Sequence, residues 1–369
     1  MKLLICTQKV DINDDLLGFF HSWIAEFAKN CEQVTVVCLE KREYDLPDNV
    51  RVLSLGKEEI SKKLKVCKAK SSLSYVCNLY KYIWKERNNY DSVFVHMNQI
   101  YVLLGGIFWR MWQKKVVLWY AHGHVSLGLR IAEKFVDDIF TSTASGCRMK
   151  SDKIRIVGQG IDVNKFESKK LSARGGSASG WKVKSDKITR LITIGRISPV
   201  KDIGTLIKAV DILVKKGINV KLYIVGKIGL SEQDEYYEFL QKLIKEKKLE
   251  DNINFAGAAA NKNIVKYLQK SDIFVSASQT GSLDKTFLEA MSCGLPVIGC
   301  NEALSAVLGD YKKDLFYAIG DFHVLSKRIE RVIGLGENDY AKMGEDLREV
   351  VVQEHGLERF VKKIFEILK

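Results

Sequence analysis

Residues 276–298 read SASQTGSLDKTFLEAMSCGLPVI, a polar loop followed by a short apolar helix that carries one glutamate, Glu289. A strand-like run, DIFVSAS (272–278), leads into the loop, and PVIGC (296–300) has the composition of the next strand. Short β-branched runs that alternate with helical segments are typical of a parallel sheet covered by helices. Ligands bind at the carboxyl ends of the strands in such sheets, so we expect the loop before Glu289 to meet a ligand.

The same alternation extends over most of the 369-residue chain. Further strands are predicted at 33–40, 91–97, 190–196, 220–226 and 253–257, and helices at 202–217, 233–248 and 263–270. A chain of this length is typical of two domains. The sequence therefore predicts an α/β fold with two Rossmann-like, doubly wound domains.

Composition and periodicity set the predicted domain boundaries. Residues 1–165 are predicted to form an N-terminal domain and residues 189–354 a C-terminal domain. Residues 166–188 are rich in Ser, Gly and Lys and lack periodicity, so they are predicted to be a linker or a mobile loop. Apolar residues near the C-terminus recur at spacings of three and four, which predicts a helix over 355–369 that packs back on the N-terminal domain.

The net charge of +13 is concentrated in one segment. Residues 61–130 contain twelve Lys or Arg and two acids, a net charge of +10. Such an excess attracts a polyanion, an anionic membrane surface or an acidic substrate, and a solvated face is the alternative. One predicted helix of this segment has an apolar face formed by Leu73, Val76, Cys77, Tyr80 and Trp84. We expect this face to pack on the core.

The composition disfavours membrane-spanning, secreted and metal-binding proteins. The apolar run at 101–112 is too short to span a bilayer and contains Arg110. The first residues have the pattern of a strand rather than of a signal peptide, so we expect a cytoplasmic protein. The eight cysteines form no CxxC pair and no cluster with His, so we predict reduced packing residues and no metal site.

Two cations follow the first predicted strand of the C-terminal domain. The run IGRISPVKD places Gly195 and Arg196 at the strand end and Lys201 at or just before the next helix. Arg grips phosphate oxygens with a fork of N–H groups and Lys adds a mobile point charge, so the pair suits a diphosphate. Ordinary surface cations are the alternative interpretation.

The next strand end also carries a glycine, Gly226, in the run IVGKIG (224–229). This run lacks the GxGxxG spacing of a dinucleotide-binding turn. The sequence therefore argues against a redox enzyme.

Glu289 has a structural alternative to a ligand-binding role. Thr286 and Glu289 have the spacing of a T-x-x-E capping box, in which the glutamate only satisfies the start of its helix. The free N–H groups at the helix start, from Lys285 to Leu288, are also expected to attract an anion such as a phosphate.

Taken together, these motifs resemble those of the nucleotide-sugar transferases of GT-B fold, most closely the family 4 retaining glycosyltransferases (glycosyl transferases group 1). IGRISPVKD resembles the G-R-x4-K donor-phosphate motif, LYIVG the strand and glycine that follow it, and FLEAMSCGLPVI the helix after the E-x7-E loop. The resemblance implies two Rossmann-like domains that face each other across a cleft. It implies that Arg196 and Lys201 hold the donor pyrophosphate and that Glu289 holds the ribose hydroxyls. The other donor-binding positions that it implies are Gly195, Gly226, Phe287 and Leu288.

The chain departs from this family at Gly281, which stands where the first glutamate of the E-x7-E motif meets the donor sugar. The next residues read SLDK instead of the common Gly-aromatic-Gly. We predict that Asp284 replaces the missing acid, with Lys285 or Thr286 at the phosphate. Loss of activity is the alternative.

In the N-terminal domain the resemblance points to two strand ends. TQKVDINDDLLGFFHSW corresponds to the glycine-bearing loop of the family, with Gly18 as the matching residue. WYAHGHV resembles the strand end that presents a histidine to the sugar, which is His122 here. An imidazole donates a hydrogen bond and titrates near neutral pH, so it suits this role. His124 and His96 remain rivals.

The resemblance predicts a retaining glycosyltransferase of the hexosyltransferase type, which moves a sugar from a nucleotide diphosphate sugar to a glycan or lipid-linked acceptor in cell-envelope polysaccharide or glycoconjugate synthesis. The predicted catalytic residues are Arg196, Lys201 and His122. No cofactor is expected beyond the nucleotide-sugar substrate. No metal is expected either, because the two cations and the helix start can stabilise the leaving diphosphate.

The expected partners are the nucleotide-sugar donor, a glycan or polyprenyl-linked acceptor, and an anionic membrane surface at the inner face of the cell membrane. Nucleic acid is not expected. Two alternatives remain open. One is a non-catalytic nucleotide-sugar binding protein or partner subunit, and the other is a nucleotide-sugar epimerase on the same fold.

Overall fold

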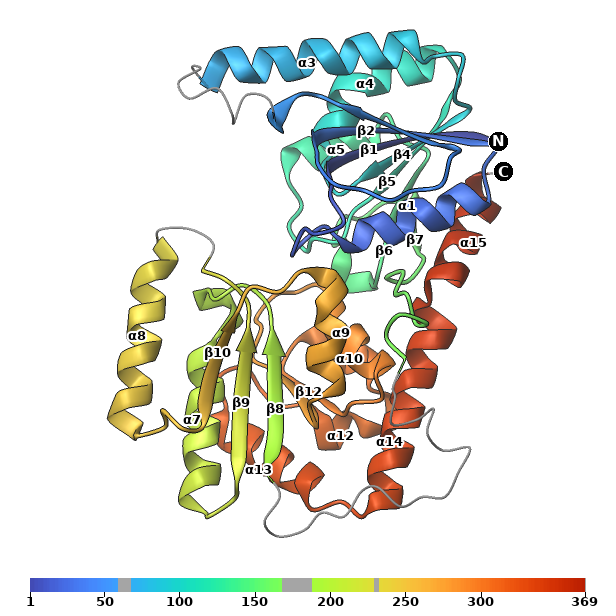
Figure 1. Cartoon of the computed structure of the whole chain (residues 1–369). Coiled ribbons are helices and arrows are strands. Elements are labelled where there is room, and N and C mark those ends of the chain that lie inside the picture. Colours follow the sequence, from blue (N-terminus) through green and yellow to red (C-terminus); the bar gives the residue numbers. More distant parts are fainter. Residues whose placement is uncertain (59–67, 168–187, 229–231, 369) are drawn as a thin grey trace. The chain divides into compact units, whose positions relative to one another are not determined.

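The computed structural model describes residues 1–58, 68–167, 188–228 and 232–368. The chain divides into two compact units (Figure 1). Unit 1 contains Met1–Gly160, Ala260–Lys262 and Leu357–Lys369, and unit 2 contains Ile161–Ala259 and Asn263–Gly356. Most of the predicted linker at 166–188 lies outside the described residues.

Unit 1 is built on a seven-stranded sheet with the order β3-β2-β1-β4-β5-β6-β7, in which neighbouring strands are parallel. The strands are β1 (Lys2–Val10), β2 (Gln33–Lys41), β3 (Val50–Ser54), β4 (Ser92–His96), β5 (Lys115–Trp119), β6 (Asp138–Thr141) and β7 (Ile154–Ile156). Its helices are α1 (Phe19–Lys29), α3 (Lys68–Lys85), α4 (Ile100–Met111), α5 (Leu127–Glu133) and α15 (Leu357–Leu368).

Side chains of this sheet alternate between two apolar cores. Leu3 and Ile5 pack with α1 and α15 on one face, whereas Leu4 and Cys6 pack with α3, α4 and α5 on the other. Successive residues of a strand point to opposite faces, so a sheet that is covered on both faces needs apolar residues at consecutive positions. The apolar runs of the sequence meet this requirement.

Unit 2 is built on a five-stranded parallel sheet with the order β10-β9-β8-β11-β12. The strands are β8 (Thr189–Ile194), β9 (Val220–Val225), β10 (Ile253–Gly257), β11 (Ile273–Ser276) and β12 (Val297–Gly299). The helices are α7 (Ile203–Lys215), α8 (Glu232–Lys247), α9 (Asn261–Gln269), α10 (Lys285–Ser292), α11 (Glu302–Val307), α12 (Lys312–Leu315), α13 (Phe322–Ile333) and α14 (Glu337–Val350). Helix α7 packs against α8 and α13, and α10 packs against α14 and β12. The predicted α/β fold with two Rossmann-like parallel-sheet domains is confirmed.

The apolar face predicted for helix α3 is wrong. Leu73, Tyr80 and Trp84 are exposed, and among residues 72–85 of this helix the buried side chains are Leu79 and Ile83. The helix carries apolar residues on more than one side, so its spacing alone allowed two choices of core face. The sheet and α4 decide between them, because Leu79 and Ile83 belong to the core that α4 shares.

The cysteines follow the prediction with one clear exception. Cys6, Cys38, Cys147, Cys293 and Cys300 are buried and free, Cys31 is half-buried and Cys77 is exposed. Cys67 lies outside the described residues. No helix in the described residues combines the length and the apolar composition that crossing a bilayer requires.

Candidate functional site

The candidate donor site lies at the topological switch point of the unit 2 sheet. The chain places β9 and β10 on one side of β8 and β11 and β12 on the other, so β8 and β11 are neighbours. The loops that follow these two strands therefore start side by side, which is the ligand-binding position of open α/β sheets. The first loop carries Gly195, Arg196 and Lys201, and the second runs from Ala277 into helix α10.

Two glycines keep the backbone compact at these strand ends. Gly195 has φ +151°, which favours a residue without a side chain. A Cβ atom on Gly226 would lie 1.8 Å from the carbonyl oxygen of Gly195, so no side chain fits there. Both predicted glycine positions thus have a structural reason, and Gly226 supports the conformation of the backbone that leads to Arg196.

Lys201 is held in place by residues of the second loop. Its Nζ donates to Oδ2 of Asp284 at 2.6 Å and to Oγ of Ser278 at 3.2 Å. Oγ1 of Thr280 in turn donates to Oδ1 of Asp284 at 3.3 Å. The contacts join the end of β8 to the start of α10, although the residues lie about eighty positions apart in sequence. An ammonium group has three N–H donors, so Lys201 keeps one for a ligand.

Arg196 differs from Lys201 in its surroundings. The side chain is exposed, and none of the described residues forms an ion pair or a hydrogen bond with it. Ser198, two residues on, is buried, and its Oγ has no hydrogen-bond partner in the described part of the chain. A charged fork and a buried hydroxyl are thus available in the segment where a diphosphate is expected.

Glu289 lies in a cluster of four charged residues, in which it is buried and the other three are half-buried. Its side chain is 3% exposed on α10, one turn after Lys285, and it interacts electrostatically with Lys285 and with Lys165. Asp162 interacts with both lysines. Burial lowers the pKa of Lys285 to about 7, and the nearby Lys165 lowers it further against the opposing charges of Glu289 and Asp162. No sequence pattern predicted that Asp162 and Lys165 would join Glu289, because more than 120 positions separate them from it.

The capping box proposed for Thr286 and Glu289 is absent. The N-cap of α10 is Asp284, and its side chain makes no capping hydrogen bond because it is directed to Lys201 instead. Thr286 lies inside the first turn of the helix. A capping role at the start of α10 therefore does not explain Glu289.

The loop around Gly281 is fixed on both sides by one side chain. Nδ2 of Asn301 donates to the carbonyl oxygens of Thr280 and Ser282, the latter at 2.9 Å. Asn301 itself caps α11, since its Oδ1 accepts from the N–H of Ala303 at 2.8 Å. The backbone at Gly281 is thus held at a defined place without a side chain of its own.

In unit 1, Gly18 immediately precedes α1. A Cβ atom there would lie 2.4 Å from the carbonyl oxygen of Asp14, so the loop closes too tightly for any side chain. The Asp14 carboxylate accepts from the N–H groups of Leu16 and Leu17 and from Nζ of Lys9 at 2.7 Å. Burial tends to raise the pKa of Asp14, but these hydrogen bonds hold it below its usual value.

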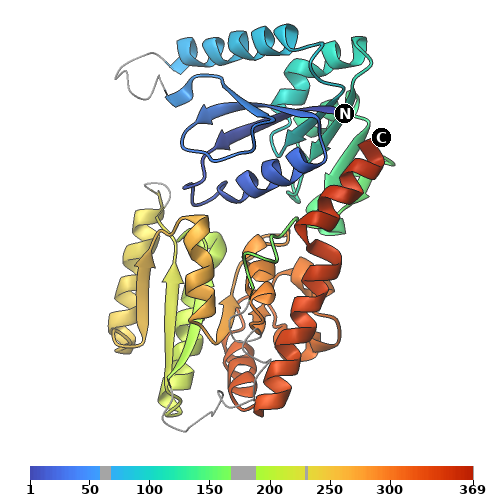
Figure 2. The same ribbon diagram turned by 45° about the vertical axis from the view of Figure 1, so that its right-hand side comes forward.

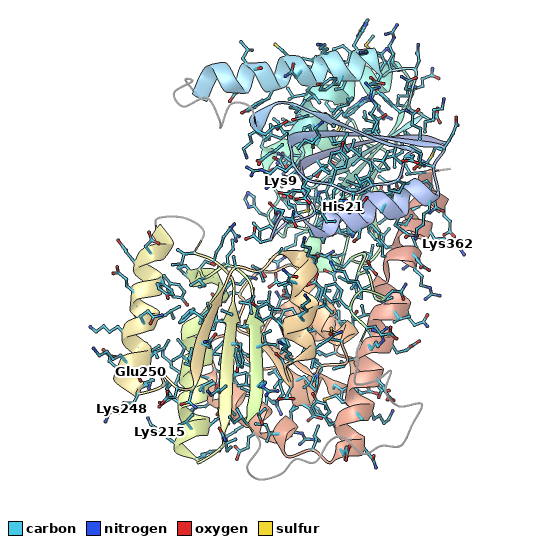
Figure 3. All side chains as sticks on the ribbon, in the orientation of Figure 1. Lys9, His21, Lys215, Lys248, Glu250 and Lys362 are labelled. Atoms are coloured by element: carbon cyan, nitrogen blue, oxygen red, sulfur yellow. The ribbon has the colours of Figure 1, made fainter. Side chains whose placement is uncertain are left out.

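A charged cluster at the carboxyl ends of β1 and β2 was not anticipated from the sequence. Nζ of Lys9, which is labelled in Figure 3, lies within 4 Å of Asp11, Asp14 and Glu40. Glu40 also pairs with Arg42. These contacts explain how the loop before Gly18 keeps its shape.

The three candidate histidines differ in burial. His122 is exposed, with its ring edge-on to Tyr120 at 5.7 Å, and partial burial lowers its pKa. His124 is also exposed. His96 is 1% exposed, stacks on Phe20 at 3.9 Å and contacts Oγ1 of Thr7 through Nδ1 at 3.1 Å. His96 therefore has a packing role that His122 lacks.

The sequence of unit 2 matches a known family over the region that contains the switch point. Residues 181–350 match glycosyl transferases group 1. This family model covers the strand ends that carry Arg196, Lys201 and Glu289, so the match and the site coincide.

The chain is also similar to curated proteins with glycosyltransferase or glycolipid synthase names. The chain is 25% identical over 228 residues to alpha-monoglucosyldiacylglycerol synthase of Streptococcus pneumoniae, which covers 59% of this chain and 48% of that protein. It is 26% identical over 231 residues to the capsular polysaccharide biosynthesis glycosyltransferase CapM of Staphylococcus aureus, which covers 60% of this chain and 54% of that protein. The chain thus spans about half the length of the curated relatives it matches.

Structural likeness extends over the whole chain. The crystal structure of Anabaena HepE in complex with UDP and glucose gives a TM-score of 0.72 at 17% identity, covering 100% of this chain and 99% of that one. Sucrose-phosphate synthase from Thermosynechococcus elongatus gives a TM-score of 0.73 at 15% identity. The likeness covers 100% of this chain and 98% of that one. These likenesses show the fold, and the predicted GT-B fold is confirmed.

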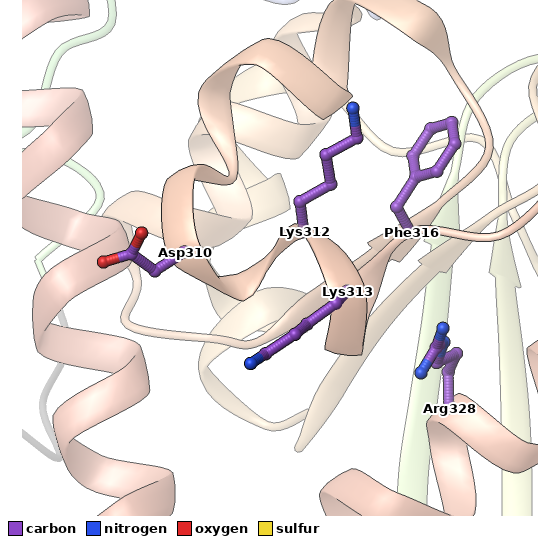
Figure 4. Close-up of a pocket in the computed structure, with 5 residues that line it drawn as sticks. All are labelled: Asp310, Lys312, Lys313, Phe316 and Arg328. Atoms are coloured by element: carbon purple, nitrogen blue, oxygen red, sulfur yellow. The ribbon is translucent and has the colours of Figure 1, made fainter.

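Unit 2 also contains a separate pocket, inside the matched region 181–350, which the sequence analysis did not predict. It has a volume of about 620 Å³ and is lined by Asp310, Lys312, Lys313, Phe316 and Arg328 (Figure 4). Nε of Arg328 is buried without a hydrogen-bond partner among the described residues. None of the predicted donor-binding residues lines this pocket. Its net positive charge comes from other side chains than those at the switch point.

Proposed function

We propose that this protein is a retaining glycosyltransferase, which transfers a sugar from a nucleotide diphosphate sugar to a glycan or lipid-linked acceptor in cell-envelope glycoconjugate synthesis. The observation that carries the proposal is the switch point of unit 2, where Arg196 and Lys201 follow β8 and Glu289 follows β11. The family match over 181–350 covers this arrangement. Two of the relatives, a glucosyldiacylglycerol synthase and a capsule glycosyltransferase, have names that support an envelope acceptor.

In the proposed mechanism the two cations act on the leaving diphosphate. The exposed guanidinium of Arg196 grips phosphate oxygens, and Lys201 donates its remaining N–H while Asp284 and Ser278 hold the other two. Together with the N-terminus of α10, these groups stabilise the negative charge that develops as the glycosidic bond to phosphate breaks. A divalent ion supplies the same stabilisation in other transferases. We propose that transfer here proceeds without one.

The ribose is assigned to Glu289. A carboxylate accepts hydrogen bonds from two vicinal hydroxyls, and Glu289 interacts electrostatically with the neighbouring Lys285 and Lys165. Asp284 is tied to Lys201, so its proposed contact with the donor sugar would require the carboxylate to serve both partners. Retention is proposed to need no enzymic nucleophile, with the leaving phosphate assisting deprotonation of the acceptor. His122 is proposed to donate a hydrogen bond to the sugar.

The test is a set of nucleotide sugars incubated with the purified chain, first alone and then with candidate acceptors. Thermal shift identifies the donor, and release of nucleotide with formation of a glycoside of unchanged anomeric configuration is the expected result. Transfer in the presence of EDTA is expected to continue. Saturable binding without nucleotide release would instead identify a binding protein, and an epimerised donor without transfer would identify an epimerase.

The proposed acceptor is polyprenyl-linked, which places the reaction at the inner face of the cell membrane. The support is the basic segment at 61–130, of which residues 61–67 lie outside the described part of the chain. An acceptor with a lipid anchor stays in the bilayer, so an enzyme that binds the membrane surface meets it there.

A further inference from the structure

Unit 1 carries an exposed cluster of aromatic and apolar side chains on α3 and α4. Ring centroids of Trp84 lie 5.5 Å from Trp112 and 6.4 Å from Phe108, and Tyr80 lies 5.7 Å from Phe108. We call the outward surface of these helices the α3–α4 surface and define it by its members Tyr80, Trp84, Ile107, Phe108, Met111 and Trp112. Figures 1 and 2 both show α3 at the outside of unit 1, on the side of the sheet where α4 lies.

Four members of the α3–α4 surface are exposed, whereas Phe108 and Trp112 are half-buried and pack against the core of unit 1. Trp84 and Ile107 are each 55% exposed and Met111 is 68% exposed. The same two helices pack on the core of unit 1 through other side chains, such as Ile83 and Trp109, which are buried. Single exposed apolar residues are common on protein surfaces, but a contiguous cluster with two tryptophans marks an interaction site.

The charged side chains of the two helices themselves are all basic, although Arg110 pairs with Asp137 at 2.8 Å. Helices α3 and α4 contain four lysines, one arginine and no acid. Lys81 and Lys85 are exposed beside Trp84, and the guanidinium of Arg87 lies 5.3 Å from the Trp84 ring centroid. The nearest acid in the sequence, Glu86, is buried and pairs with Arg51. The surface thus presents apolar rings inside a margin of positive charge.

We propose that the α3–α4 surface docks on an anionic lipid bilayer, with Trp84, Ile107 and Met111 entering the headgroup region. Tryptophan and tyrosine favour this layer because their rings are amphipathic. Lysine and arginine at the margin bind the anionic headgroups. The exposed aliphatic side chains Ile107 and Met111 suit hydrocarbon better than stacked nucleobases, which require accessible ring faces. The inference deepens the proposed function, since it names the membrane contact through which a lipid-linked acceptor reaches the enzyme.

The experiment is sedimentation of the full chain with vesicles, without donor or acceptor, so that its outcome does not depend on turnover. Vesicles of neutral phosphatidylcholine are compared with vesicles that also contain phosphatidylglycerol. Binding is expected only with the anionic lipid and is expected to fall as sodium chloride is raised. Fluorescence of the exposed Trp84 is expected to shift to shorter wavelength on binding.

Two variants of the α3–α4 surface test its two components. Replacing Lys81 and Lys85 by Gln is expected to weaken binding about 25-fold, since each charge near an anionic leaflet contributes about fivefold. Trp84→Ser combined with Met111→Ser is expected to weaken vesicle binding by about tenfold or more, because this variant has less apolar surface to transfer from water into the bilayer. Both variants are expected to keep the wild-type melting temperature, because the replaced side chains are exposed.

A matched control changes an exposed aromatic and two exposed lysines on α8 of unit 2, in the variant Phe239→Ser, Lys242→Gln, Lys245→Gln. This variant is expected to bind vesicles like the wild type. The proposal is overturned by absent binding to anionic vesicles, by equal binding to neutral ones, or by an α8 variant that loses as much binding as the α3–α4 variants. Vesicle binding with no sugar transfer from any donor would support the docking surface and contradict the proposed function.

Discussion

Nζ of Lys201 lies 2.6 Å from Oδ2 of Asp284, so the cation assigned to the donor phosphate already has an acidic partner. Both side chains are about four-fifths buried. The pair orients the ammonium group, but it also places a negative charge near the expected diphosphate. The balance between these two effects can be measured.

Replacing Asp284 by Asn removes that negative charge while keeping a hydrogen-bond acceptor for Lys201. We expect Asp284→Asn to bind the nucleoside diphosphate about three- to tenfold more tightly, because the repulsion is lost. Isothermal titration with the diphosphate measures this change. Glu330→Gln, which breaks the exposed pair with Lys216, is the control and is expected to leave the affinity unchanged. Unchanged affinity in Asp284→Asn, together with altered preference among donor sugars, would assign Asp284 to the sugar instead.

The two cations are expected to act mainly in the transition state. Arg196→Ala and Lys201→Ala should each lower kcat/KM by the equivalent of about 2 to 4 kcal/mol, as loss of a charge-stabilising donor does elsewhere. Steady-state kinetics with the identified donor provide the measurement. Lys242→Ala on the exposed side of α8 serves as a control. Near-normal rates in both variants would show that the diphosphate lies elsewhere.

Glu289→Ala is expected to weaken nucleotide binding by about 1.5 to 3 kcal/mol, because the ribose hydroxyls lose a charged acceptor. The variant also leaves Lys285 and Lys165 with Asp162 as their remaining acid in the cluster, so some loss of stability is expected as well. Comparing the nucleotide with its free base and phosphate separates the two effects. Equal weakening of all three ligands would indicate a purely structural role.

The pKa of Lys285, lowered to about 7 by burial, predicts a pH dependence of stability. Between pH 7 and its unfolded pKa of about 10.4, the unfolded chain binds a proton that the folded chain has lost. The free energy of unfolding is therefore expected to rise from pH 7 to pH 9, and this rise should be smaller in Lys285→Gln. Urea unfolding at several pH values measures both slopes. Parallel curves for the two proteins would contradict the prediction.

Gly226→Ala is expected to destabilise the fold and to impair turnover, because the new Cβ would meet the carbonyl oxygen of Gly195 at 1.8 Å. A loss of about 1 to 3 kcal/mol in the free energy of unfolding is typical of such overpacking. Gly204→Ala on α7 is a matched control, since its Cβ would have no neighbour closer than 3.7 Å. This control should be neutral or slightly stabilising. A variant Gly226→Ala with wild-type stability and rate would show that the two strand ends move apart freely.

The sequence located the regular elements of this protein with small errors. The strand predicted at 253–257 has these bounds as β10, and the apolar spacing near the C-terminus identified α15. Such elements follow from neighbouring residues, because strand and helix periodicities are local properties of the chain. For the same reason the candidate cations and Glu289 were found from motifs at strand ends.

Only the tertiary structure decided which of these side chains meet. The pairing of Lys201 with Asp284, and of Lys165 and Asp162 with Glu289, depends on the order of strands in the sheet and leaves no local pattern in the sequence. The outward face of α3 is a similar case. Its helix offers apolar residues on two sides, and the side that became buried was the one whose residues fit against the sheet and α4, which left Tyr80 and Trp84 at the surface.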